Sequence, residues 1–352
     1  MGLGIAIAVG GSPDEELAAA ALVEVHERIG EMTTYRLRYD IDVVEGDFPM
    51  LVDERIGPGS ELAVIAPIDG ANNYLVKGPV TGQKIHLAHG GAGSFVEVSG
   101  TDTTIAMDRE TKTTLWSDIT DSDAVTTILG QYGYTPDVDS TAAGHYETKH
   151  TLVQRDTDLQ FVQRLARRNG FLFWIDCDEM GIETAHFKRP PLDGDPAGDL
   201  IINLDSNSLE AVDINWDVER PTSVVAAQLD LNDKSDIDGA VAQSPLTSLN
   251  AEALSAIAAD TRSIHIVAPV DDAGDLQSRG EGTLVEANWF IRATCQTTVN
   301  ALNALVRAHT VINLRGAGTR FSGKYLVSGV RHEIDATAHR MDVELISNGW
   351  GS

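Results

Sequence analysis

The stretch TKHTLVQRDTDLQFVQRLARRNGFLFWI, residues 148–175, contains the signals that decide most about the fold. Asp156 or Asp158 is predicted to cap a helix, and Asn169-Gly170 is typical of the end of a helix. Between these signals, apolar residues recur at helical spacing. They are Leu159, Phe161, Val162, Leu165 and Ala166. The pattern predicts an amphipathic helix that buries one stripe.

Charge and hydropathy around this helix extend the prediction. Arg164, Arg167 and Arg168 come late in the helix, where positive charge suits the exposed carbonyl groups. The run FLFWI, residues 171–175, then predicts a strand that is buried on both faces. The segment therefore reads as helix, stop and buried strand.

The composition limits the possible classes of protein. The chain has 352 residues and a formal net charge of −27, and its largest basic cluster is the pair Arg167-Arg168. Specific nucleic-acid binding is not expected from such a chain. No apolar run is long enough to cross a membrane, and no secretory signal is expected at the N-terminus. Cys177 and Cys295 are expected to be unpaired thiols. The acidity fits either adaptation to salt, which the scattered acids favour, or the lining of a channel.

Three regions differ in their pattern. Residues 1–100 contain short apolar runs separated by turn signals, which indicates a β-sandwich or β-barrel. Residues 107–196 mix helix and strand signals and end in a Pro-rich linker at 190–196, so we expect a small inserted α/β domain. Residues 197–352 return to strands, with one helix expected at 275–293. The fold class is therefore expected to be mainly β, of the α+β type.

No catalytic motif survives inspection. His332-Glu333 begins like a zinc-protease motif, but the second histidine of that motif is missing. His86 and His89 have a spacing suited to a metal only on a helix, and their segment reads as strand and turn. His145 is expected in a polar surface loop. No metal, cofactor or catalytic residue is therefore assigned, and we expect a protein that is not an enzyme.

Two blocks resemble a known family. Residues 154–170 are similar to the block of glutamine, arginine, aspartate and apolar residues in the phage late control D family, and residues 321–334 resemble its closing hairpin strand. That family comprises the central hub proteins of contractile-tail baseplates and the hub half of VgrG-type spike proteins. The matching positions are given structural roles: Arg155, Asp158, Leu159, Phe161, Arg164, Leu165, Gly170, Gly323, Tyr325, Val327, Val330 and His332.

The resemblance implies an architecture and an assembly. It implies two antiparallel β-barrel domains of the tail-tube type, at 1–105 and 197–352, with the α/β domain inserted at 106–196. The second barrel would include one helix and the closing hairpin. A homotrimer would then form a ring that adapts the hexameric symmetry of a tail tube to a trimeric spike. The expected location is the baseplate of a virion tail or injection particle, assembled in the host cytoplasm.

The resemblance also implies partners. They are other copies of the chain, a tail tube protein, a spike or tip protein, and baseplate wedge or LysM-type adaptor proteins. DNA or protein cargo would only pass through. Because the chain stops soon after the hairpin, at Trp350-Gly351-Ser352, the spike is expected to be a separate polypeptide. This favours a phage tail or phage-like extracellular particle over type VI secretion.

A second class of function stays open at this point. Scattered carboxylates could supply an acid and a base, so a tail-associated hydrolase or glycan-binding β protein is the alternative. The oligomeric state separates the two classes, because a monomer that cleaves cell-wall polymer would favour the enzyme and a trimer would favour the hub.

Overall fold

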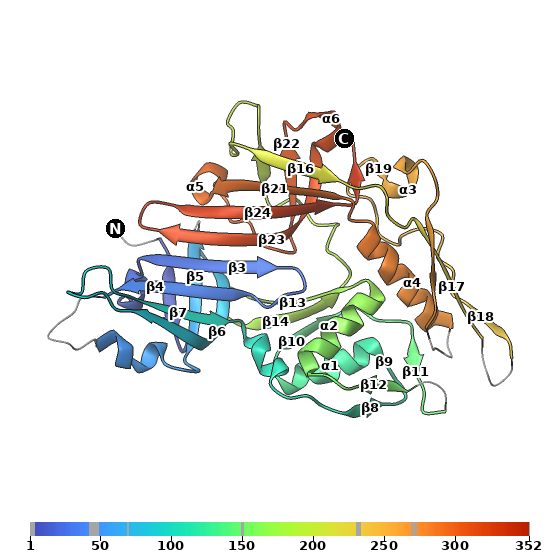
Figure 1. The fold of residues 1–352 in the computed structure, drawn as a ribbon, viewed down its shortest axis with the longest axis horizontal. Coiled ribbons are helices and arrows are strands. Elements are labelled where there is room, and N and C mark those ends of the chain that lie inside the picture. Colours follow the sequence, from blue (N-terminus) through green and yellow to red (C-terminus); the bar gives the residue numbers. More distant parts are fainter. Residues whose placement is uncertain are drawn as a thin grey trace.

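The chain folds around one large antiparallel sheet that the N-terminal and C-terminal thirds share (Figure 1). The computed structural model describes residues 4–41, 49–68, 70–148, 151–229, 234–268, 270 and 273–351. The central strands lie side by side in this order: β16 (Val212–Trp216), β21 (Ile291–Thr298), β24 (His339–Ser347), β23 (Gly323–Asp335), β3 (Leu22–Arg28), β4 (Thr34–Asp40), β7 (Phe95–Thr101) and β6 (Ala71–His86).

Alternation of apolar and polar residues explains why these segments are strands. In β4, Tyr35, Leu37 and Tyr39 are buried, whereas Arg36 and Asp40 are exposed. Successive side chains of a strand point to opposite faces, so this alternation gives the sheet one apolar and one polar face. Strand β24 alternates in the same way, with Met341, Val343 and Leu345 buried.

The long strands β6 and β23 each change partners along their length: β6 pairs first with β5 and then with β7, and β23 pairs first with β22 and then with β3. Residues 71–79 of β6 pair with β5 (Glu61–Ile68), which in turn pairs with β1 (Ala6–Val9) and then β2 (Ser12–Pro13). Residues 323–326 of β23 pair with β22 (Val311–Arg315), which pairs with β15 (Asp199–Ile201). Both long strands therefore begin in an outer layer and end in the central sheet.

The segment 103–188 has its own core below the central sheet. Helices α1 (Asp121–Gln131) and α2 (Asp158–Asn169) pack on a three-stranded sheet of β10 (Thr135–Val138), β14 (Glu183–Lys188) and β13 (Leu172–Cys177). Short pieces complete it: η4 (Thr103–Asp108), β8 (Thr114–Trp116), β9 (Ile119–Thr120), β11 (Gly144–His145) and β12 (Leu152–Gln154). The α/β character expected for this region is observed.

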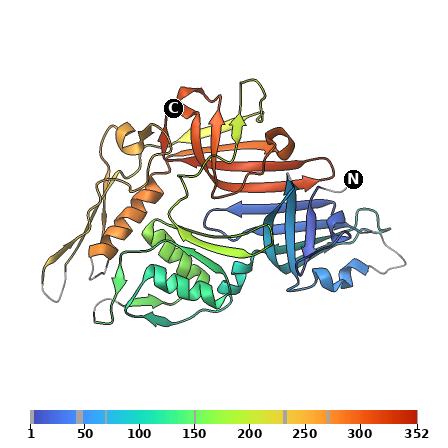
Figure 2. The same ribbon diagram turned by 180° about the vertical axis from the view of Figure 1, so that it is seen from behind.

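An arm extends from the other end of the molecule (Figure 2). Helix α4 (Ala273–Ala287) packs on β17 (Ser223–Leu229), β18 (Asp236–Asp238) and β20 (Ser263–Ile266). The remaining short elements are η1 (Leu17–Ala19), η2 (Pro49–Val52), η3 (Glu54–Ile56), β19 (Glu252–Ala253), α3 (Leu254–Ile257), α5 (Val299–Leu302), α6 (Gly318–Phe321) and β25 (Gly349–Trp350).

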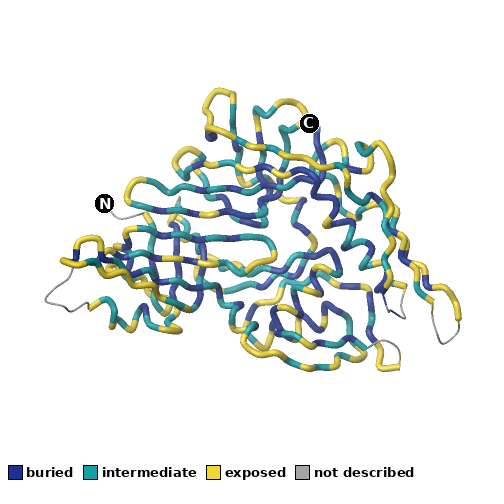
Figure 3. Tube along the Cα trace, in the orientation of Figure 1, coloured by how far each residue is buried: buried dark blue, intermediate teal, exposed yellow. Residues whose placement is uncertain are grey.

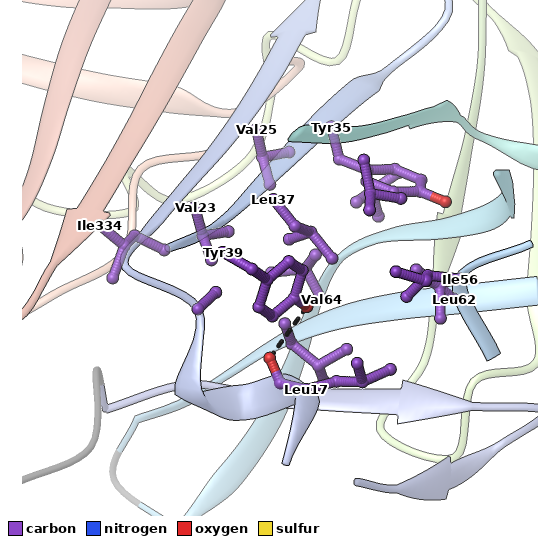
Figure 4. Packing of buried hydrophobic residues seen from close by; sticks show 14 of the residues in the cluster. Leu17, Val23, Val25, Tyr35, Leu37, Tyr39, Ile56, Leu62, Val64 and Ile334 are labelled. Atoms are coloured by element: carbon purple, nitrogen blue, oxygen red, sulfur yellow. Dashed lines mark hydrogen bonds between the residues drawn. The ribbon is translucent and has the colours of Figure 1, made fainter. Parts of the chain in front are cut away.

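Two apolar cores lie behind the central sheet, and burial is concentrated there (Figure 3). In the first core, the Tyr39 hydroxyl donates to the Leu17 carbonyl at 3.0 Å, among Val23, Leu37 and Val64 (Figure 4). The second core surrounds Tyr325, which is 1% exposed. The layers that contain these two cores cover one face of the central sheet. The opposite face is open in the described part of the chain.

Several sequence-based boundaries need correction. Helix α4 ends at Ala287, because β21 begins at Ile291 and pairs with β24, so the helix expected at 275–293 is too long. Helix α2 is capped by Thr157, whose hydroxyl accepts from the Gln160 amide at 3.3 Å, and neither Asp156 nor Asp158 is the cap. The strand at Phe171–Ile175 is only partly buried, since Trp174 and Ile175 are half-buried.

The closed barrels implied by the resemblance are not formed within one copy of the chain. Among the described residues, no pairing returns from β2 to β3 or from β15 to β16. The reason is that β6 and β23 divide their pairing between two layers, which leaves open sheets. The mainly β class is confirmed. No helix among the described residues is long and apolar enough to cross a membrane.

Candidate assembly surface on the open sheet

The uncovered side of the central sheet, called here the open face, carries alternating cations and acids. It consists of the side chains that point away from both cores. Among them are Glu24 and Arg28 of β3, Arg36 and Arg38 of β4, Arg331 and Glu333 of β23, Arg340, Asp342 and Glu344 of β24, and Lys84 and Glu97 of β6 and β7. The same face runs across all eight strands without interruption.

Ion pairs connect neighbouring strands across the open face. Arg331 contacts Glu24 on β3 and lies 3.7 Å from Asp342 on β24. Arg36 lies 3.0 Å from Glu24, and Arg340 lies 3.2 Å from Glu333. Cross-strand pairs of opposite charge stabilise the register of a sheet. The open face is thus a polar surface whose charges largely satisfy one another, although the chain as a whole is strongly acidic.

The ion pairs of the open face shift the pKa values of two of its arginines. The hydrogen bond to Glu24 raises the pKa of Arg331, and the hydrogen bond to Glu344 raises the pKa of Arg28. Both guanidinium groups are more than one-third exposed, so these pairs contribute little to stability at ordinary ionic strength. Each of these pairs instead joins opposite charges on neighbouring strands of the open face.

The two ends of the central sheet are free edges. Among the described residues, β16 pairs only with β21, and residues 81–86 of β6 pair only with β7. Both edges carry exposed apolar side chains: Trp216 is 50% exposed, Ile85 is 45% exposed and Leu87 is 52% exposed. An unpaired edge with exposed apolar residues is a template for pairing with another chain.

A groove of about 1160 Å³ lies beside the β16 edge. It is bounded by the loop at residues 202–211 and by the open face of β21, β24 and β23, including Asp213, Arg331 and Arg340. Most residues that line the groove are polar. Its place next to a free edge makes it part of the same surface.

A buried polar junction behind the sheet links β3, β6 and the segment that precedes β22. Glu27 of β3, which is 5% exposed, accepts from Arg307 at 2.6 Å and from the Ala308 amide at 3.1 Å. Arg307 also donates to the Tyr74 carbonyl of β6 at 2.7 Å. Burial alone would raise the pKa of Glu27, but Arg307 and His332 outweigh it and lower the pKa. The charged form of Glu27 is therefore part of the folded state.

An aromatic stack lies next to this junction. The ring of Trp174 in β13 is sandwiched between His186 of β14 and His309, with centroid separations of 4.5 Å on each side. Burial lowers the pKa of His309 to about 4. The stack thus fastens the inserted α/β region to the loop before β22 through a neutral imidazole.

The first block of predicted residues lies in and around α2. Leu159, Phe161 and Leu165 are buried in the core of the α/β region. Gly170 is the left-handed C-cap, with φ of 68°, as the sequence predicts. Arg155 is exposed. Arg164 pairs with Asp156 at 3.1 Å, so it faces the start of the helix and not its carbonyl end.

Asp158 lies buried in a network of hydrogen bonds at the start of α2. It is 1% exposed and accepts hydrogen bonds from Lys112, from the Tyr132 hydroxyl at 2.6 Å and from Gln154 at 2.7 Å. Burial would raise the pKa of this carboxyl, but these three donors lower it. At the first turn of α2 the residue thus contacts the segment between η4 and β8, the C-cap of α1 and the end of β12.

The second block lies on β23, far from the first. Gly323 has φ of 146° and lies against Asn250, and Tyr325, Val327 and Val330 are buried in the core behind the sheet. The fully buried His332 is 3.0 Å from His339 between ring nitrogens and 3.6 Å from Glu27. The structure therefore places the two blocks in separate cores, and only His332 reaches the polar junction.

Sequence reasoning missed several buried polar residues. Glu27 follows Val23 and Val25 on the apolar side of β3, and a charge in that register was the available signal. His145 was expected at the surface, but it is 2% exposed and lies 2.8 Å from Asp121, which also binds Arg168. Arg168 is therefore held in a buried ion pair, not at an exposed helix end. No local signal marks this pairing, because its partners are distant in sequence.

Candidates for a reactive site in such a chain are clusters of metal-ligating side chains and its two cysteines. No group of three or more His, Cys, Asp or Glu side chains in it could hold a metal ion. Cys177 and Cys295 are free thiols, as expected, and burial raises the pKa of each to about 12. Thiols with such a pKa are poor nucleophiles near neutral pH.

The fold is shared with tail proteins. Over 99% of this chain and 97% of the other, it is similar to the tail protein from Neisseria meningitidis MC58, at 14% identity and a TM-score of 0.68. The 43 kDa tail protein of prophage MuSo2 from Shewanella oneidensis matches over 98% of both chains, at 14% identity and a TM-score of 0.64.

A third similar structure is that of a secretion-system protein. An Escherichia coli component of the type VI secretion system, itself described as similar to the bacteriophage T4 tail proteins gp27 and gp5, matches at 15% identity and a TM-score of 0.60. The match covers 98% of this chain and 79% of the other. The resemblance to phage tail proteins and VgrG-type hub proteins is thereby confirmed at the level of the fold, without the closed barrels. No curated protein matches the sequence.

These structures define the class: a mainly β protein with the fold of phage tail proteins and of their type VI secretion counterparts. Within that class the chain belongs to the family described as the Alg8 N-terminal domain, whose model matches residues 3–336. This family carries a different description from the late control D family that the sequence blocks resemble.

Proposed function

We propose that the chain is a structural hub subunit of a contractile tail or phage-like injection particle, and that three copies form a ring. One observation carries the proposal: the central sheet is continuous through both halves of the chain and has a free edge at each end. The two edges differ, so pairing one with the other between copies is heterologous, and such a contact forms a ring when the rotation from copy to copy closes. The fold that the chain shares with tail proteins supports this reading.

The strand order supports two equivalent units in each copy. The strands β3, β4, β6 and β7 come in this order in the chain, with β5 between β4 and β6, and lie in the spatial order β3, β4, β7, β6. The strands β16, β21, β23 and β24 lie in the matching order β16, β21, β24, β23. We name these the first unit and the second unit, and we propose them as the tube-type domains, with the α/β region of 106–196 inserted between them.

Three copies would place six such units around an axis. Both cores of the central sheet lie on its covered side, so the open face would line the central passage. Six similar units match the symmetry of a hexameric tube, and three chains match a trimeric spike. A tail tube protein, a spike and baseplate proteins are accordingly the proposed partners, with DNA or protein cargo in transit and a location in the baseplate. A separate polypeptide for the spike stays a prediction.

Light scattering after size-exclusion chromatography tests the proposal, together with imaging of the particles. We expect a mass about three times the 37.8 kDa of one chain and a ring with a central opening. If assembly requires a spike, we expect the trimer on mixing the two proteins. A species that stays monomeric at high concentration with its tube and spike partners would contradict the hub.

A further inference from the structure

The two units match residue by residue, and a pair of β-bulges fixes the alignment. In the first unit the register of β6 on β7 shifts between Val80 and Gly82, which lies opposite Ser99. In the second unit the register of β23 on β24 shifts between Val327 and Gly329, which lies opposite Glu344. Gly82 therefore corresponds to Gly329.

The residue left out at each bulge makes the same hydrogen bond. The Thr81 hydroxyl donates to the Ser99 carbonyl at 3.4 Å, and the Ser328 hydroxyl donates to the Glu344 carbonyl at 3.2 Å. Because bulges are specific features of a strand pair, two bulges with the same geometry and the same side-chain bond support this alignment.

Inside one copy, the second unit meets the first through β23 and β3. His332 lies opposite Val25, and Arg331 lies opposite His26. Arg331 also reaches diagonally to Glu24, with which it forms an ion pair. This internal junction is an observed example of how one unit pairs with the next.

The alignment of the two units identifies the residues at the free edges that correspond to the residues of the internal junction. Counting from the bulges, Lys84 and Ile85 of β6 correspond to Arg331 and His332. In the second unit, β16 pairs with β21, and β21 pairs with β24. In the first unit, β3 pairs with β4, and β4 pairs with β7 in the same way, so the residues of β16 correspond to those of β3. Asp213, Ile214 and Asn215 thereby correspond to Glu24, Val25 and His26.

Resting on the proposed ring, we infer the register of the contact between copies. Strand β6 of one copy pairs antiparallel with β16 of the next, with Ile85 opposite Ile214 and Lys84 opposite Asn215. Leu87 then lies opposite Val212. The partner of this surface is therefore a second copy of the same chain, held in one defined register.

The side chains fit this register on both faces. The exposed apolar groups Ile85 and Leu87 meet Ile214 and Val212 on the covered side, where Ile85 and Leu87 are 45% and 52% exposed in one copy. On the open face Lys84 reaches diagonally to Asp213, as Arg331 reaches Glu24 in the internal junction. Asp213 is exposed and has no ion-pair partner among the described residues of its own copy.

Pairs of introduced cysteines test the register. Residues directly opposite in antiparallel strands have Cβ atoms about 5 Å apart, within reach of a disulfide, whereas diagonal residues are about 7–8 Å apart. We expect Ile85→Cys with Ile214→Cys to give covalent oligomers up to the trimer on oxidation. The control pair Ile85→Cys with Trp216→Cys should give at least tenfold less. Each single variant shows the background from Cys177 and Cys295.

A second pair guards against a folding defect at apolar positions. Lys84→Cys with Asn215→Cys lies on the open face, and the Lys84 side chain is 70% exposed, so these changes leave the cores intact. Covalent trimers from either direct pair support the register. A trimer by light scattering that cross-links only through the diagonal pair, or through none of the pairs, overturns the register but leaves the ring. A protein that does not self-associate, or a covalent ladder beyond the trimer, overturns the ring itself.

Discussion

Glu27 holds a charge at a position of β3 where the preceding inward residues are valines. The charge is tolerated because Arg307, the Ala308 amide and His332 surround the carboxylate. Removing one member of a buried ion pair leaves the other uncompensated and costs about 3–5 kcal/mol. A single substitution at the polar junction should therefore affect the contacts of both β3 and the segment before β22.

We predict that Glu27→Gln lowers the free energy of unfolding by about 3 kcal/mol, because Arg307 then lies partly buried without a counter-charge. Denaturant unfolding measures the change. The matched control is Glu31→Gln, whose side chain is 59% exposed in a surface pair with Arg28 and should change stability by less than about 0.5 kcal/mol. Equal losses in both variants would contradict a special role for the junction.

His309 makes stability depend on pH. Its pKa is lowered to about 4 from the usual 6.5, so the folded state favours the neutral ring. The resulting stability is complete above about pH 6.5 and is lost as the pH falls towards 4. The pKa of His339 is lowered to about 3 and acts in the same direction, while the raised pKa of His186 acts in the opposite one.

Comparing wild type with His309→Gln separates this histidine from its neighbours. Between pH 7 and pH 5 we expect the wild type to lose about 1–2 kcal/mol more unfolding free energy than the variant. Denaturant titrations at both pH values measure the difference. Parallel losses in the two proteins would show that His309 is not the group that titrates.

At the scale of elements, α2 and α4 approach closely through glycine. A Cβ on Gly282 of α4 would lie 2.7 Å from the carbonyl oxygens of both Arg167 and Arg168 of α2. The same contact region contains Gly170, whose left-handed conformation ends α2. The arm is therefore fixed to the α/β region by backbone contact.

We predict that Gly282→Ala destabilises the protein by about 1–3 kcal/mol, although alanine favours a helix by about 1 kcal/mol. The matched control is Gly130→Ala in α1, where a Cβ meets nothing within 4 Å. That change should be neutral or stabilising in the same thermal and denaturant measurements. A stabilised Gly282→Ala would contradict the close approach of the two helices.

Local pattern predicted the elements better than their ends. The stripe from Leu159 to Ala166 predicted α2 because its spacing belongs to the helix alone. The same spacing, continued through Ala287 to Ile291, wrongly extended α4, because the strand pairing of β21 overrides it. The buried pairs of Asp121 with His145 and of Glu27 with Arg307 join residues far apart in sequence, so no local pattern announces them.

At the scale of the whole molecule, the chain has a large negative net charge, whereas on the open face cations and acids pair with one another. If the net charge of −27 is a salt adaptation, unscreened repulsion should destabilise the subunit in dilute buffer. We expect a melting temperature several degrees higher in molar sodium chloride than at low ionic strength. The same scan in sucrose controls for general solvent exclusion. Equal melting temperatures in low and molar salt would reject the adaptation.

The strands β6 and β23 each belong to two layers at once. A force applied along the wall of a ring built from this chain would therefore pass from inner to outer layer through covalent backbone. It would not depend on side-chain contacts sliding past one another. Such a wall would resist shear between its two layers. Gly82 and Gly329 lie at the bulges near which β6 and β23 pass from one layer to the other.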